Sequence, residues 1–327
     1  RMERIIIGIH GLGNKPAPGL LHAWWRRSLH EGFRAIGHPR RNLPLATVYW
    51  ADLLHRAPEN PAITDPRDPL FLKEPYRPSS GKPSPHGAPV GRRIIDLFEK
   101  PLKRMELDEN GTVWKHLNDL VLRNFFQELE AYYANSLEIA PGAAVPYRDI
   151  VRRRLSTMLQ AHREKEILLI AHSMGSIIAY DVLTLCAPEI RIHTLITIGS
   201  PLGIPFVMQK IRQEQNLPRG ARLAVPENVG CWINLADPAD KVAFDCHLGD
   251  DFAANSRAVF ASDAAVFNDY AIDGERNAHK SYGYLRTPEL ALTCFEFLTQ
   301  GQSAGAIRRS DLLNRLRDGA LRLLRLG

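Results

Sequence analysis

Short apolar runs alternate with longer amphipathic stretches along most of this chain. Six runs have the length and apolar content of buried strands: residues 4–10, 45–50, 166–171, 194–198, 231–235 and 264–268. Five stretches place apolar positions at helical spacing: residues 18–36, 146–163, 174–185, 204–214 and 287–300. Strands that alternate with helices form mostly parallel sheets with helices on both faces, so the pattern predicts an α/β fold.

Residues 51–145 interrupt this alternation. The stretch 55–92 holds nine prolines and little apolar periodicity, and proline blocks both helix interiors and sheet ladders. Helical patterns follow at 92–106 and 113–138. We therefore expect a core made of residues 1–50 and 146–300, with residues 51–145 inserted as a cap or lid.

The strongest signal for chemistry is ILLIAHSMGSII at residues 167–178, an apolar strand that runs directly into a helix through Ser173. A turn this sharp needs small residues two positions away on each side, and Ala171 and Gly175 meet that need. The pattern predicts a nucleophile elbow, with the Met174 amide at the helix N-terminus as one oxyanion donor. The alternative is a serine that only caps a helix.

The first predicted strand ends in His10, Gly11, Leu12 and Gly13. A loop of this kind after an early strand supplies the second oxyanion N–H in lipases and esterases, and Leu12 is the expected donor. The alternative is a plain glycine turn after a buried strand. We expect His10 and Gly11, together with His172 beside the elbow, to line or support the substrate site.

A serine hydroxyl needs a histidine base, and the histidine needs a carboxylate that orients it. On this fold the chain order is serine, acid, histidine. Asp237 and Asp240 lie in the loop after the strand 231–235, and we favour Asp240 because Asp237 precedes proline and suits a turn. After that loop the histidines are His247 and His279, and His279 lies where the base belongs.

These residues resemble the α/β-hydrolase superfamily. The stretch HSMGSIIAYD from His172, with IGSPLG from Ile198 one strand later, is similar to the lipase-like branch, including inositol-deacylase-like and intracellular phospholipase A1-like hydrolases. Ala171 stands where the motif usually has its first glycine. The resemblance implies an α/β-hydrolase fold and hydrolysis of carboxylic esters, while the substrate does not transfer with it.

Charge and cysteine content narrow the alternatives. The chain carries a net charge of +6, but residues 301–327 hold six arginines and two aspartates, so the body is nearly neutral and nucleic acid is not an expected partner. The four cysteines form no CxxC pair, which argues against a zinc or redox site. A disulfide between Cys231 and Cys246 is an alternative to reduced thiols.

Residues 301–327 themselves predict a basic amphipathic helix, with apolar positions at helical spacing and arginines between them. Such a helix either lies on an anionic membrane surface or docks onto the body or a partner subunit, and the second is commoner.

No apolar run is long enough to cross a bilayer, and the first strand is too short for a signal-peptide core. We expect a cytoplasmic protein, with peripheral membrane contact through 305–327 as the alternative.

Taken together, the sequence predicts a serine hydrolase that cleaves small-molecule or lipid esters through an acyl-enzyme. Ser173 attacks, His279 acts as base and then acid, Asp240 orients His279, and the chemistry needs neither a metal nor an organic cofactor. An acyltransferase that uses the same triad is one alternative. A non-catalytic scaffold on a hydrolase fold is another.

Overall fold

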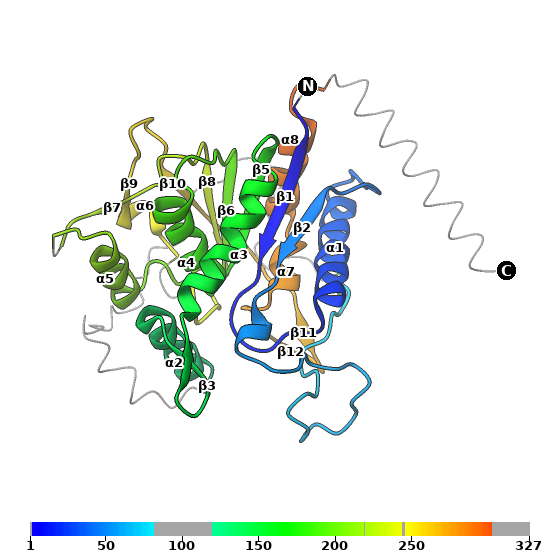
Figure 1. Ribbon diagram of the computed structural model, residues 1–327. Helices are drawn as coiled ribbons and strands as arrows, with labels where there is room; N and C mark the ends of the chain where they lie inside the picture. The colour runs from blue at the N-terminus through cyan, green and yellow to red at the C-terminus, as the bar shows by residue number, and fades with distance from the viewer. Residues whose placement is uncertain (1, 82–119, 219, 244–245, 303–327) are drawn as a thin grey trace.

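A six-stranded parallel sheet forms the centre of the computed structural model, which describes residues 2–81, 120–218, 220–243 and 246–302 (Figure 1). Every neighbouring pair of these strands runs parallel. In order across the sheet they are β10 (Ala261–Ala265), β8 (Trp232–Ala236), β6 (Thr194–Ile198), β5 (Glu166–His172), β1 (Arg4–Ile9) and β2 (Leu45–Val48). The predicted α/β fold is therefore confirmed.

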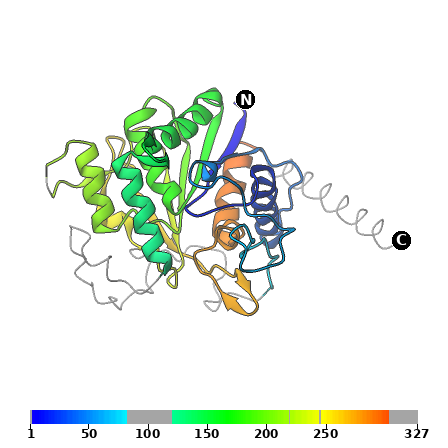
Figure 2. The same ribbon diagram turned by 60° about the horizontal axis from the view of Figure 1, so that its bottom comes forward.

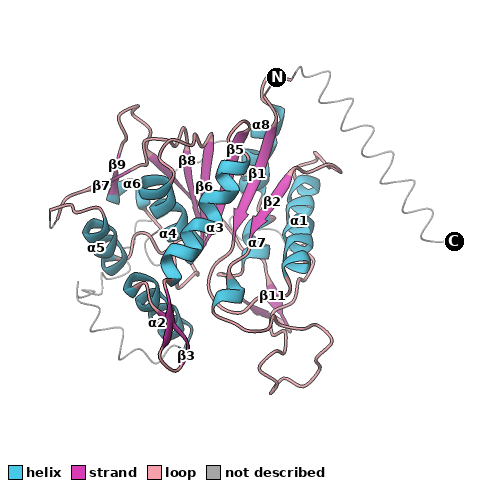
Figure 3. Cartoon of the chain, viewed as in Figure 1, coloured by secondary structure: helices cyan, strands magenta, loops and turns pink. Residues whose placement is uncertain are grey.

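Helices cover both faces of the sheet (Figure 3). One face packs against α3 (Tyr147–Ala161), α4 (Met174–Asp181) and α5 (Pro205–Glu214), and α4 continues as a single π turn, Val182–Cys186. The other face packs against α1 (Pro18–Ala35), α7 (Ser281–Leu285) and α8 (Pro288–Thr299).

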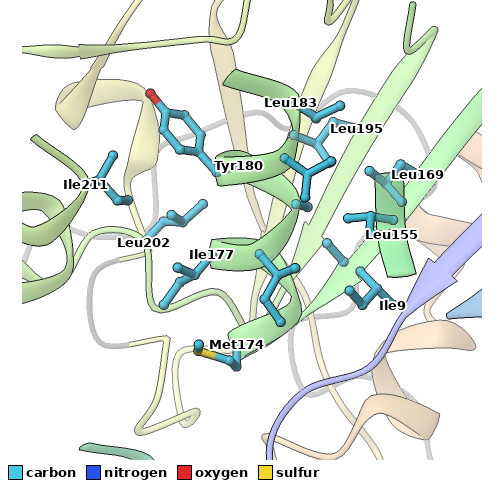
Figure 4. Close-up of a cluster of buried hydrophobic side chains, with 14 of the residues drawn as sticks. Ile9, Leu155, Leu169, Met174, Ile177, Tyr180, Leu183, Leu195, Leu202 and Ile211 are labelled. Carbon is cyan, nitrogen blue, oxygen red and sulfur yellow. The ribbon is translucent and has the colours of Figure 1, made fainter. Parts of the chain in front are cut away.

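The period-two geometry of a strand explains how β1 serves both faces. Ile5, Ile7 and Ile9 belong to the core under α3 and α4, whereas Ile6 belongs to the core under α1. Figure 4 shows Ile9 in the first of these clusters, beside the α4 side chains. Because β1 and β5 are buried on both faces, their sequences read as continuous apolar runs.

The strand order reverses between β1 and β5, since the chain adds β2 on one side and β6, β8 and β10 on the other. In open parallel sheets, ligands bind beyond the carboxyl ends of the strands at such a reversal. Smaller elements gather at this edge, as Figures 1 and 2 show. They are η1 (Ala51–Leu53), α2 (Leu120–Ala134) and the hairpins β3 (Leu137–Ala140)–β4 (Ala143–Val145) and β11 (Ala271–Ile272)–β12 (Glu275–Arg276).

Two further pieces of structure lie near the end of the sheet formed by β8 and β10. The short helix α6 (Leu248–Asp251) packs against β10, and β7 (Leu223–Ala224) pairs in parallel with β9 (Phe252–Ala253).

The thiols of Cys231 and Cys246 are not joined by a disulfide. Among the residues that the structure describes, none of the helices combines the length and the apolar character needed to span a bilayer.

Four predicted elements differ from the structure or fall outside the described residues. The last strand lies at Ala261–Ala265 instead of 264–268, because its polar Asp263 is satisfied by Asn234 inside the sheet and hides the strand from an apolar pattern. The helix predicted at 113–138 ends at residue 134, where Asn135 takes a positive φ of 51° and a hairpin follows. The predicted helices at 92–106 and 301–327 lie outside the described residues, apart from 301 and 302.

Candidate active site

Ser173 lies at the carboxyl end of β5, in the turn that leads into α4. Its φ of 54° and ψ of −127° belong to a region that non-glycine residues rarely occupy, and such strain persists only where the surrounding structure imposes it. The backbone N–H of Ser173 donates to the Ile198 oxygen of the neighbouring strand at 3.0 Å, which fixes the turn. This geometry is that of a nucleophile elbow.

Three side chains from three separate loops meet at this turn. The Nε2 atom of His279 lies 2.9 Å from the Ser173 Oγ, and its Nδ1 atom lies 2.9 Å from both carboxylate oxygens of Asp240. The Asp240 carboxylate is buried, whereas the His279 ring is partly exposed. Burial alone would raise the pKa of Asp240, but the His279 ring and the hydrogen bonds to the carboxylate hold this pKa below its usual value.

Asp237 has a different set of partners. Its carboxylate accepts from the backbone N–H groups of Ala239 and Asn268 at 2.9 and 2.7 Å, and it pairs with Arg276 at 2.7 Å. The Asp237 carboxylate therefore connects the loop after β8 to Asn268, which precedes β11, and to Arg276 of β12. Of the two aspartates that the sequence left open, Asp240 is the one in contact with His279. His247, the other histidine after the loop that holds these aspartates, immediately precedes α6 and interacts with Asp263.

The loop after β1 passes directly beside Ser173. A Cβ atom added to Gly11 would lie 2.6 Å from the Ser173 Cβ, so only glycine allows this approach. Leu12 follows in the loop, and Met174 is the first residue of α4. Of the two residues expected to supply oxyanion N–H groups, Leu12 thus comes from the loop after β1 and Met174 from the first position of α4, directly after Ser173.

His10 is buried, and both of its ring nitrogens have backbone partners. The Trp50 backbone N–H donates to Nε2 at 3.0 Å, so Nδ1 carries the proton and donates to the Gly11 carbonyl at 2.7 Å. Burial lowers the pKa of His10 to about 3, which keeps the ring neutral. Because the C=O and N–H of a trans peptide point in opposite directions, this contact turns the Leu12 N–H away from His10.

His172 is also buried, and its Nε2 donates to the main-chain oxygen of His279 at 2.8 Å. Burial, followed by the nearby His279 ring, lowers the pKa of His172 well below its ordinary value, so this ring also stays neutral. Its Nδ1 atom is buried and has no hydrogen-bond partner among the described residues. His10 and His172 therefore support the loops around Ser173 through backbone contacts, and a direct contact with substrate stays a prediction.

Two residues that the sequence reasoning missed complete the surroundings of the acid. The Tyr284 hydroxyl donates to Asp240 Oδ2 at 2.7 Å and accepts from the Asp237 backbone N–H at 2.9 Å. A Cβ atom on Gly199, which has a φ of +55°, would lie 2.8 Å from Asp240 Oδ2 and 3.2 Å from His279 Nδ1. Gly199 begins the Gly-Ser-Pro sequence, which was noted only as a family likeness, whereas no motif marks Tyr284.

The described part of the proline-rich stretch, residues 55–81, forms a strap that joins two of these loops. At one end, the Glu59 backbone N–H donates to the Lys15 carbonyl at 2.9 Å, next to the loop that contains Leu12. At the other end, the Glu74 carboxylate accepts from Asn277 Nδ2 at 2.5 Å and from Lys280 Nζ at 2.8 Å. Asn277 in turn accepts the backbone N–H of His279 at 2.9 Å. The strap thus contacts residues 277–280, here called the histidine loop, on both sides of His279.

Comparison with known proteins gave one family match. The family described as PGAP1-like alpha/beta domain matches residues 115–216, a segment that contains Ser173 and runs beyond α5. This match supports the α/β-hydrolase superfamily and, in general terms, an esterase-type enzyme. Searches of the curated proteins and of the solved structures found no match.

Proposed function

We propose that this protein is a serine hydrolase that cleaves carboxylic esters through an acyl-enzyme. The observation that carries the proposal is the unbroken set of hydrogen bonds from Ser173 Oγ through His279 to Asp240, with Ser173 held in an elbow. The PGAP1-like match supports this activity at the level of the superfamily. The resemblance to inositol-deacylase-like and phospholipase A1-like hydrolases stays a prediction.

In the proposed reaction, Ser173 Oγ attacks the ester carbonyl carbon while His279 Nε2 takes the hydroxyl proton. The carbonyl π electrons move to the oxygen, and the N–H groups of Leu12 and Met174 stabilise the oxyanion. When the oxyanion collapses, the bond to the alcohol breaks and His279 returns the proton to the leaving oxygen. Water then attacks the acyl-enzyme by the same steps in reverse, and it releases the acid and free Ser173.

Asp240 acts in this scheme as a charged hydrogen-bond acceptor. It fixes the tautomer of His279, with the proton on Nδ1, and it stabilises the imidazolium that forms in each half-reaction. Tyr284 helps to keep Asp240 in place. Burial and the Asp240 carboxylate raise the pKa of Tyr284 well above its ordinary value, so its hydroxyl stays protonated and donates.

We infer an apolar acyl group from the apolar core that begins at Met174, the residue after Ser173. Met174 belongs to a buried apolar cluster that also contains Phe126 of α2 and Phe206 of α5, whose rings meet edge to face at 6.2 Å. Leu12 packs against the same cluster. We therefore infer a small-molecule or lipid ester as substrate, with the acyl chain next to these side chains.

A panel of p-nitrophenyl esters from acetate to palmitate tests the proposal on the wild type and on Ser173→Ala. We expect the wild type to hydrolyse the panel with a preference for acyl groups longer than acetyl, and we expect Ser173→Ala to lose on the order of 10⁴-fold or more in kcat. An added acceptor alcohol separates hydrolysis from acyl transfer by the products. Equal rates for the two proteins would refute a role for Ser173.

A further inference from the structure

The side chain of Lys15 folds back on the loop that it follows. Its ammonium donates to three successive main-chain oxygens, those of Leu12, Gly13 and Asn14, the last two at 3.0 and 3.4 Å. An ammonium has three N–H donors and no acceptor, so its hydrogen-bonding capacity matches these three carbonyls. The Lys15 ammonium therefore holds three consecutive carbonyl groups on the same side of the loop.

This arrangement fixes the direction of the amides in the same loop. The Leu12 carbonyl and the Gly13 N–H belong to one trans peptide unit and point in opposite directions. Lys15 holds the carbonyl, while the Gly13 amide interacts with the Glu128 carboxylate of α2. The unit between Leu12 and Gly13 is thus held at both ends, and the unit before it is held by His10.

We propose that Lys15 is a positioning residue that holds the loop after β1 in the conformation in which the Leu12 N–H serves as oxyanion donor. This inference rests on the proposed ester hydrolysis, because the direction of that N–H matters only if an oxyanion forms beside Ser173. Lys15 acts through the backbone and does not touch the reacting atoms. Its hydrogen bonds are charge-assisted and therefore stronger than those of a neutral donor.

The protonation of Lys15 gives this role a pH dependence. Burial, followed by the nearby charge of Lys280, lowers the pKa of Lys15 to about 8. Other charged and titratable groups face Lys15 from several elements. They are Glu59, Glu74 and His55 of the strap, Glu128 of α2, Lys280 of the histidine loop, and His10 and His172 at the ends of β1 and β5. The ammonium is present below about pH 8 and is lost above it. Turnover should therefore fall as the pH rises through that value.

The experiment compares pH–rate profiles of ester hydrolysis for the wild type, Lys15→Met and Lys15→Arg. Lys73→Met is the matched control, because Lys73 is exposed on the strap and interacts with Glu59, one of the carboxylates that also face Lys15. We expect Lys15→Met to lower kcat about tenfold or more, somewhat less than the loss of a donor itself. Lys15→Arg should retain turnover at pH 7 and lack the decline above pH 8, because a guanidinium stays charged. Lys73→Met should match the wild type.

Two outcomes would overturn the inference: a kcat for Lys15→Met equal to that of the wild type, or a decline above pH 8 that persists unchanged in Lys15→Arg. If Lys15→Met does not fold, the comparison of Lys15→Arg with the wild type decides alone. A wild type that hydrolyses no ester and whose Ser173 resists a fluorophosphonate would instead refute the proposed function. In that case the failure lies in the chemistry and not in Lys15.

Discussion

Asp237 and Asp240 lie in the same loop after β8, yet their carboxylates face different partners. Asp240 contacts His279 and Tyr284, whereas Asp237 ties the loop to Asn268 and Arg276. The turn that follows Asp240 explains why its carboxylate faces the histidine loop. The Val242 N–H donates to Asp240 at 2.9 Å and helps to aim its carboxylate at the histidine loop.

The two asparagine variants separate these roles. We expect Asp240→Asn to lower kcat by about 10⁴-fold, because the amide no longer imposes the required tautomer on His279. Asp237→Asn should retain turnover within about tenfold and lose about 1–3 kcal/mol of unfolding free energy, because one of its buried hydrogen bonds becomes a donor–donor contact. Measurements of kcat and of urea unfolding on both variants check this. The reverse pattern would make Asp237 the functional acid.

A second prediction at the residue scale concerns His10 and the pH dependence of the unfolding free energy. Its pKa is about 3 in the folded protein and near 6.5 in the unfolded chain. Between these values the unfolded chain binds a proton at this residue and the folded chain does not. The unfolding free energy contributed by His10 is therefore present above pH 6.5 and is lost as the pH falls, by about 1.4 kcal/mol per pH unit for a full proton.

Glutamine can replace the neutral ring with one donor and one acceptor but cannot be protonated in this range. We expect His10→Gln to show a smaller loss of unfolding free energy between pH 7 and pH 5 than the wild type, measured by urea denaturation at both pH values. His172 stays neutral in the folded state of both proteins, so its contribution to the loss is the same in both and cancels. Identical losses in the two proteins would mean that His10 is not held neutral by burial.

At the scale of elements, a buried polar cluster connects α2, which lies in the predicted insertion, to α4, the helix that follows Ser173. The Tyr132 hydroxyl of α2 donates to Asp181 of α4 at 2.7 Å. Arg152 of α3 donates to both, at 2.9 Å to the Tyr132 hydroxyl and at 2.6 Å to the Asp181 carboxylate. Burial alone raises the pKa of Asp181, and Arg152 opposes this shift. Buried hydrogen bonds thus join α2 to both α3 and α4.

Tyr132 and its neighbour Tyr133 form a matched pair for testing this cluster. Tyr132→Phe removes a hydroxyl that bonds to two buried charged groups, and we expect it to lower the unfolding free energy by about 1–3 kcal/mol. The Tyr133 hydroxyl is buried without a hydrogen-bond partner among the described residues, so Tyr133→Phe should be neutral or stabilising. Urea denaturation compares them. Equal destabilisation by both variants would show that the cluster contributes nothing specific.

At the scale of the whole molecule, the parts that the sequence predicted well are those with strong local patterns. The runs that became β1, β5, β6 and β8 are apolar on both faces, and the α/β fold follows from their alternation with helices. The sharp turn at Ser173 between β5 and α4 could be predicted because its small neighbours stand at fixed offsets. The order of serine, acid and histidine then limited the choice to a few residues.

The parts that the sequence missed depend on contacts between distant segments. Glu74 meets Asn277 and Lys280 only because the strap returns to the histidine loop, and nothing near residue 74 indicates this. Tyr284 reaches Asp240 because α7 turns back under the loop after β8. Strand β10 was misplaced because its polar Asp263 is satisfied inside the sheet. Local pattern carries little information about any of these contacts.

Covalent labelling shows whether Ser173 is a nucleophile that His279 activates. The wild type would be treated with a fluorophosphonate and the modified peptide identified by mass spectrometry, with Ser173→Ala and His279→Ala as comparisons. We expect a single adduct on Ser173, absent from Ser173→Ala and formed much more slowly in His279→Ala. An adduct on another serine, such as Ser176 or Ser200, whose hydroxyl oxygens lie 2.7 Å apart nearby, or no adduct at all, would contradict it.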